Sequence, residues 1–236
     1  MRRLALVAVV GLAAAGCSHA TKHVRHDPCA SSRHSAAKQL KTSRALRGDV
    51  DGDGAPDRIA LVRLRDNAPC GAVLVVRSGH RVYERAFPTV GDPRIPLLNG
   101  LAALRPGSLQ IVVTTWEGAS TAFARVFTIR LGRVSEIQTD TVDGTIPYEG
   151  SVTHFNAVDC VRGRPGTIVS SGWFERGASG RRFGFNRLFY RVGERSFEPA
   201  GRQSGRTRSP LPQRGRFPEF GEPQPFPSCM RVRAVS

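Results

Sequence analysis

The first stretch of this chain that could do chemistry is a run of four closely spaced aspartates, DVDGDGAPD, at residues 49–57. Carboxylate and carbonyl oxygens are the ligands that Ca²⁺ prefers, at about 2.3–2.6 Å. A bound cation also relieves the mutual repulsion of clustered carboxylates. Gly54 permits the sharp turn that brings alternate side chains toward one centre. We therefore predict a calcium site whose ligands are Asp49, Asp51, Asp53, the carbonyl of Ala55, and Asp57.

The element that must position these ligands is the apolar run that follows them, Ile59–Val62, which is typical of a β-strand. The loop is not an EF-hand, because the twelfth residue counted from Asp49 is Ala60 rather than glutamate. A metal-free Asp/Gly turn is the simpler alternative. The pattern D-x-D-x-D-G-x-x-D before an apolar strand resembles the FG-GAP/VCBS repeats of integrin-like β-propellers. This resemblance implies a structural role, in which calcium fixes the hairpin of one blade.

The body of the chain contains an internal repeat. Segments 97–120 and 155–179 both contain, in the same order, Asn, Arg-Pro-Gly, an apolar run, Trp, Glu and Gly-Ala-Ser. The aspartate loop and its strand form a first, partial copy. Each copy is followed by a glycine-containing hairpin signature, at residues 76–82, 129–134 and 190–197. Each unit would hold three or four strands, as a propeller blade does.

These repeats predict an all-β fold of repeated β-meander units that is propeller-like, with about three blade-like repeats. A closed propeller typically has four to eight blades. Strand-like segments at 45–46 and 230–232 could complete a further blade. Alternatively, the units form an open or small barrel-like meander, or close by dimerisation. We assign residues 46–200 to the repeated domain and 201–236 to a segment rich in Pro, Gly and Arg. We expect 200–228 to be loop, packed down through Phe217, Phe220 and Phe226.

The N-terminus has the pattern of an export signal. A basic start, Arg2-Arg3, precedes an apolar run at residues 4–15 that is too short to span a bilayer. Small residues then precede Cys17, which resembles a bacterial lipobox. The resemblance implies a lipoprotein signal peptide at 1–16 and acylation of Cys17, for example with palmitate. Residues 17–45 would be a tether to the membrane. An ordinary secretory signal peptide is the alternative.

Four further cysteines, Cys29, Cys70, Cys160 and Cys229, are compatible with two disulfides in an exported chain. Their wide spacing is unlike that of zinc ligands, which come in close pairs. Three connectivities are possible. We expect Cys29–Cys70 and Cys160–Cys229, because these pairs tie each end of the chain to the nearest part of its body.

The formal net charge of +16 bears on partners. Outside a cell, a basic surface favours anionic lipid headgroups, wall polymers or acidic glycans. We expect no nucleic-acid partner, because the chain has an export signal and no nucleic-acid-binding motif.

Catalytic motifs are absent from the sequence: it contains no G-x-S-x-G, H-E-x-x-H, P-loop or G-x-G-x-x-G. Glu117 and Glu175 stand at matching repeat positions beside Trp116 and Trp173. Paired carboxylates about 5–10 Å apart would suit glycoside hydrolysis. The simpler interpretation is that the tryptophans fill equivalent core positions and the glutamates face water.

The sequence therefore predicts a membrane-anchored, extracytoplasmic, calcium-stabilised binding or scaffolding module rather than an enzyme. Its expected partners are membrane lipid, through acylated Cys17, and an anionic envelope polymer or protein. The alternative is an exported glycan-acting hydrolase that uses Glu117 and Glu175.

Overall fold

The computed structural model describes residues 29, 39–42, 44–64, 70, 72–87, 96–139, 144–151, 153–176, 182–208 and 217–234. The described residues do not include the predicted signal peptide, Cys17 or most of the tether. The structure therefore does not test these predictions. Within the described ranges, no helix is long and apolar enough to cross a membrane.

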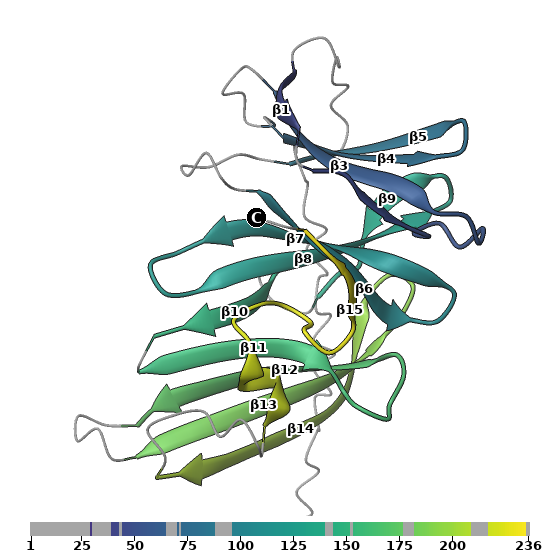
Figure 1. Cartoon of the computed structure of the whole chain (residues 1–236). Coiled ribbons are helices and arrows are strands. Elements are labelled where there is room, and N and C mark those ends of the chain that lie inside the picture. The colour runs from purple at the N-terminus through teal and green to yellow at the C-terminus, as the bar shows by residue number, and fades with distance from the viewer. Residues whose placement is uncertain are drawn as a thin grey trace, which may run out of the picture.

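The described strands form two antiparallel sheets (Figure 1). In the five-stranded sheet, β3 pairs with β4 and β4 with β5, while β1 and β2 both pair with β3. Its strands are β1 (Gln39–Thr42), β2 (Leu46–Gly48), β3 (Asp57–Leu64), β4 (Ala72–Ser78) and β5 (Arg81–Phe87).

The ten-stranded sheet has the order β14-β13-β12-β11-β10-β8-β7-β6-β15, and β9 also pairs with β8. It curls into a half-barrel. Its strands are β6 (Leu97–Arg105), β7 (Ser108–Glu117), β8 (Ala122–Arg130), β9 (Arg133–Glu136), β10 (Ile146–Gly150), β11 (His154–Cys160), β12 (Thr167–Glu175), β13 (Phe183–Val192), β14 (Phe197–Thr207) and β15 (Met230–Arg233).

The repeated units appear in the structure as three four-stranded meanders, β2–β5, β6–β9 and β11–β14. The all-β prediction is therefore confirmed. The second and third meanders do not stand as separate blades, because β10 pairs with β8 on one side and with β11 on the other. The terminal strand β15 joins the larger sheet beside β6, whereas β2 pairs with β3. Of the alternatives, the described arrangement corresponds to the open, barrel-like meander.

Three apolar clusters hold these layers together. One lies between the sheets, where buried side chains of the first meander pack on those of the second, among them Leu46, Ile59, Leu101, Ile111 and Phe127. A second connects the strands of the half-barrel. A third buries Trp173, Phe183 and Phe185 under a 3₁₀-helix at Pro218–Gly221.

Two predicted boundaries are wrong. Part of the expected tether, Gln39–Thr42, is strand β1, because its backbone pairs with the end of β3. Part of the expected C-terminal loop, up to Thr207, continues strand β14. β14 is an edge strand whose side chains are mostly exposed. Its backbone forms hydrogen bonds with β13, so the strand forms although its sequence does not alternate between apolar and polar residues. The prediction that Phe217, Phe220 and Phe226 pack down is confirmed, since all three are buried.

Both expected disulfides are present. Cys29 is bonded to Cys70, and Cys160 to Cys229. The second bridge fastens the C-terminal segment to β11, next to the point where Phe226 N donates to Val158 O. Each disulfide therefore ties one end of the described chain to the sheet nearest to it, as the cysteine spacing predicts.

Candidate metal centre

The aspartate loop connects β2 to β3 in the first meander. Its base is closed by the pairing of Gly48 with Asp57. Gly52 and Gly54 have φ of 84° and 86°, which lie in the left-handed region that favours glycine. The two glycines therefore let the chain reverse within a few residues, which brings Asp49 and Asp51 close to Asp57.

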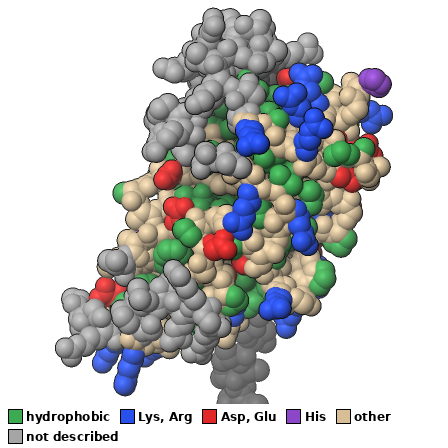
Figure 2. All heavy atoms as spheres, in the orientation of Figure 1, with side chains coloured by type: hydrophobic (Ala, Val, Ile, Leu, Met, Phe, Trp, Pro, Cys, Tyr) green, Lys and Arg blue, Asp and Glu red, His purple; other side chains and the backbone are tan. Residues whose placement is uncertain are grey.

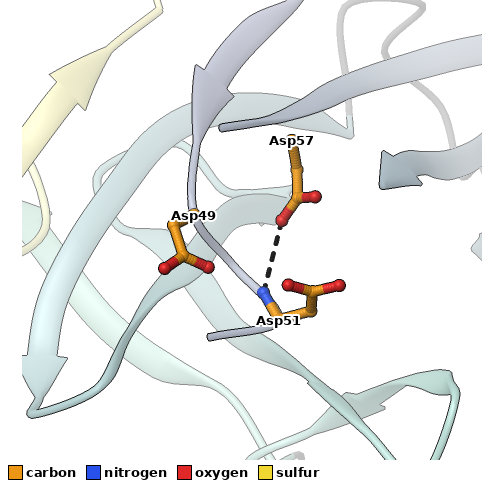
Figure 3. Close-up of side chains that lie close together, drawn as sticks. All are labelled: Asp49, Asp51 and Asp57. Carbon is orange, nitrogen blue, oxygen red and sulfur yellow. Dashed lines mark hydrogen bonds between the residues drawn. The ribbon is translucent and has the colours of Figure 1, made fainter. Parts of the chain in front are cut away.

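Three of the four aspartates meet. Asp49, Asp51 and Asp57 each offer a carboxylate oxygen, and these three oxygens lie within 4.8 Å of one another (Figure 3). Oxygens that share a cation at about 2.5 Å can be at most about 5 Å apart. The spacing of the three carboxylates therefore fits one metal ion. Asp57 is buried, with 2% of its surface exposed, while Asp49 and Asp51 are half-buried.

Backbone amides already orient these carboxylates. Asp57 Oδ2 accepts from Val50 N at 2.8 Å and from Asp51 N at 3.3 Å. Asp49 Oδ1 accepts from Gly52 N at 2.7 Å, and its Oδ2 accepts from Gly54 N at 3.0 Å. These bonds hold the side chains in place through the local fold, so a cation would meet a largely preformed group.

The other two predicted ligands stand apart from this group. Asp53 is exposed, and its Oδ1 accepts from Ala55 N at 2.8 Å. That contact is an Asx turn, in which the side chain stabilises the local backbone. Ala55 is also exposed, and its role as a carbonyl ligand remains a prediction. Hard oxygen donors, with no nitrogen or sulfur among them, fit calcium or magnesium better than zinc.

The loop lies where the two sheets meet. Leu109 N, at the start of β7, donates to Asp49 O at 2.8 Å. A Cβ on Gly52 would lie 3.2 Å from Gly107 O in the β6–β7 turn. From its own sheet, Ser78 Oγ at the end of β4 donates to Asp51 Oδ2 at 2.7 Å. One loop is thus in contact with the hairpin of the first meander and with the turn of the second.

A buried aspartate in the third meander has a structural role. Asp159 is buried, and it accepts from Cys160 N, Ser228 N and Ser228 Oγ. Burial raises the pKa of this carboxyl, and the hydrogen bonds from Ser228 oppose that shift. Through these contacts Asp159 holds the C-terminal segment against β11, beside the Cys160–Cys229 disulfide.

The two repeat-equivalent tryptophans differ, which corrects the expectation that both fill core positions. Trp173 is 2% exposed and stacks on Phe183 with ring centroids 4.5 Å apart, whereas Trp116 is 50% exposed. The β7–β8 register shifts between Thr114 and Trp116. This irregularity turns Trp116 outward, where it lies against Phe123.

Glu117 and Glu175 end strands β7 and β12, which are four strand positions apart in the sheet. Neighbouring strands are about 4.8 Å apart, so the two positions are separated by roughly 19 Å along the sheet. Because the sheet curls into a half-barrel, this path is not the direct distance between the two carboxylates, and the shared catalytic pair, which needs about 5–10 Å, stays a prediction.

The acid that does interact with Glu117 is Glu149, which sequence reasoning did not single out. Burial raises the pKa of Glu149, and the charge of Glu117 raises it further. Glu149 also has a φ of 65°, which is unusual for a residue with a side chain. No sequence signal marks it, because the neighbourhood arises from the pairing of β10 beside β8.

Comparisons with known proteins do not assign this chain to a family: no family model, no curated protein and no solved structure matches it. The functional argument therefore depends on the residues themselves.

Proposed function

We propose that this chain is an exported, lipid-anchored binding or scaffolding module whose β-domain is stabilised by calcium. The observation that carries the proposal is the group of three carboxylates, Asp49, Asp51 and Asp57, held within 4.8 Å at the junction of the two sheets. A cation there would tie the end of β2 to the start of β3 within one loop, and that loop packs on the β6–β7 turn. Its contribution would be to rigidify the loop through which the first meander contacts the second.

Two further features support the proposal. The two disulfides are compatible with an oxidising compartment outside the cytoplasm. The export signal and Cys17 provide the sequence basis for a lipid anchor. The similarity of the loop to FG-GAP/VCBS repeats is part of the same proposal, and it implies a structural ion in a propeller-like arrangement of meanders.

The test is a thermal melt of residues 18–236, which retain every described residue, with and without Ca²⁺. A ligand that binds only the folded state at about 100 times its Kd adds about 2.7 kcal/mol. For a domain of this size, that corresponds to a rise in Tm of about 5–10 °C. Mg²⁺ at the same concentration tests the identity of the ion.

Variants of the loop make the test specific. Asp51→Asn and Asp57→Asn should each abolish the calcium-dependent rise, while Glu84→Gln, an exposed acid on β5, should keep it. Asp53→Asn shows whether the fourth aspartate joins the ligands. If Tm is the same with and without calcium in the parent chain, the loop is a plain Asp/Gly turn and the calcium proposal fails.

A further inference from the structure

Three arginines lie in one row across the five-stranded sheet. Arg47 on β2 pairs with Arg58 on β3, and Arg58 pairs with Arg77 on β4. Residues that pair directly across antiparallel strands point to the same face of a sheet. All three arginines are exposed, and the row ends at Val82 on β5, which is 48% exposed.

The opposite face of the sheet explains why this row faces outward. The neighbouring row, formed by Leu46, Ile59, Val76 and Tyr83, is buried in the core between the two sheets. Side chains alternate between faces along each strand, so the arginines are directed away from that core. Figure 2 shows Lys and Arg side chains gathered over this sheet, in the upper part of the view.

This row is electrostatically unfavourable by itself. Like charges directly opposite each other on neighbouring strands, about 4.8 Å apart, destabilise a sheet. Among the described residues, none of the three arginines forms an ion pair. Within the described part of the sheet, the acid on the same face is Glu84. It pairs with Val75, in the next row of side chains on that face. The row therefore presents three guanidinium groups with little local compensation.

We propose that Arg47, Arg58 and Arg77 form a docking surface for the phosphate groups of anionic lipid headgroups. A guanidinium is planar, always charged and presents a fork of donors that matches phosphate oxygens. Three exposed guanidinium groups in a line suit a planar array of phosphates. Each anion between two arginines would replace their repulsion by two charge-assisted hydrogen bonds.

The choice of lipid as the occupant comes from the path of the N-terminal chain, and it rests on the proposed anchor at Cys17. Cys29 packs with Val73 and Ala86, which pair with each other on the same sheet face as the arginine row. Only eleven residues lie between Cys17 and Cys29. They span at most about 40 Å when fully extended. An acylated Cys17 would thus keep this face within reach of the bilayer, at a high effective concentration of headgroups.

The test is vesicle sedimentation with residues 18–236, which lack the anchor, at fixed calcium and 0.1 M salt. Vesicles of 30% phosphatidylglycerol in phosphatidylcholine are compared with pure phosphatidylcholine. Each basic residue at an anionic surface contributes about fivefold to the partition coefficient. Arg47→Gln, Arg58→Gln and Arg77→Gln together should therefore weaken binding to the anionic vesicles by about a hundredfold.

A matched control separates this surface from overall charge. Arg191, Arg202 and Arg206 are exposed arginines on β13 and β14 of the ten-stranded sheet, and these strands lie at the opposite edge of the molecule from the five-stranded sheet (Figure 1). Changing all three to Gln removes the same charge from the other sheet, and exposed charges more than about 10 Å apart are largely screened from each other at this salt concentration. The control variant should lose less than about fivefold, and both variants should keep the parent Tm within a few degrees.

Three outcomes would overturn the proposal. One is an equal loss in the two triple variants, which would indicate non-specific charge attraction. Another is unchanged vesicle binding in the Arg47/Arg58/Arg77 variant. The last is binding of soluble polyphosphate through these arginines without binding to the anionic vesicles, which would make a free polyanion the occupant. Because the anchor is absent and calcium is fixed, failure here is distinguishable from failure of the calcium-dependent melt.

Discussion

The ion pair between Arg187 and Glu219 makes the sharpest prediction about stability. Glu219 is 1% exposed, and its carboxylate accepts from Arg187 Nε at 2.7 Å, from Arg187 Nη2 at 3.2 Å and from Ser171 Oγ at 2.6 Å. Arg187 also lies over the rings of Phe189 and Phe217. These contacts hold the 3₁₀-helix at Pro218–Gly221 on the sheet.

Removing the arginine should cost much more than neutralising the glutamate. Arg187→Met keeps most of the apolar stem but leaves Glu219 buried with only Ser171 as a partner, and breaking a buried pair in this way costs about 3–5 kcal/mol. In Glu219→Gln, the amide can still accept from Ser171, and the guanidinium, whose side chain is 16% exposed, can reach water. We expect that variant to lose about 1–2 kcal/mol.

The assay is urea unfolding of residues 18–236, followed by tryptophan fluorescence, because Trp173 lies in the same cluster as Phe217. The double variant Arg187→Met/Glu219→Gln should lose less than the sum of the two single changes, because the double variant leaves no unpaired charge behind. A loss below about 1 kcal/mol for Arg187→Met, or strict additivity, would refute the reasoning.

Two further predictions concern the C-terminal bridge and Glu149. Replacing Cys160 and Cys229 by Ala opens a loop of 69 residues, which should cost about 4 kcal/mol in the chain-entropy model; calorimetry under non-reducing conditions measures the loss, and an unchanged Tm would contradict it. The pKa of Glu149 is raised in the folded state by burial and by Glu117, so the folded state binds this proton more tightly than the unfolded state. The contribution of Glu149 to stability is therefore fully present below its ordinary pKa and is lost as pH rises through the raised one. Glu149→Gln should flatten this part of the stability–pH curve in urea titrations, whereas Glu117→Gln should flatten it only partly, because burial is the larger cause.

Much of the fold follows from local sequence patterns. The glycine-containing hairpins, the apolar runs and the recurring Asn, Arg-Pro-Gly and Trp positions predicted three β-meanders, and the cysteine spacing predicted both bridges. The boundary at Thr207 was missed because the edge strand β14 has exposed side chains and carries no alternating pattern. The boundary at Gln39–Thr42 was missed because this short strand is defined by its pairing with β3, which is distant in the sequence. The outward turn of Trp116 was missed because a one-residue register shift leaves no trace in composition.

Only the part of the candidate site that lies within one short segment of the sequence could be predicted. Spacing alone identified Asp49, Asp51 and Asp57, because all three belong to one short loop. It could not exclude Asp53 from the group, since that depends on which backbone amide each carboxylate accepts from. The arginine row was also hidden, because Arg47, Arg58 and Arg77 become neighbours only through strand register.

The position of the loop explains why one metal site would be enough for three repeats. The second and third meanders are joined by backbone hydrogen bonds through β10, so their junction needs no other link. The first meander belongs to a separate sheet. It is held to the second by the apolar core between the sheets and by contacts such as that of Leu109 N with Asp49 O. A cation bound by Asp49, Asp51 and Asp57 would therefore act on the loop that lies where continuous strand pairing ends.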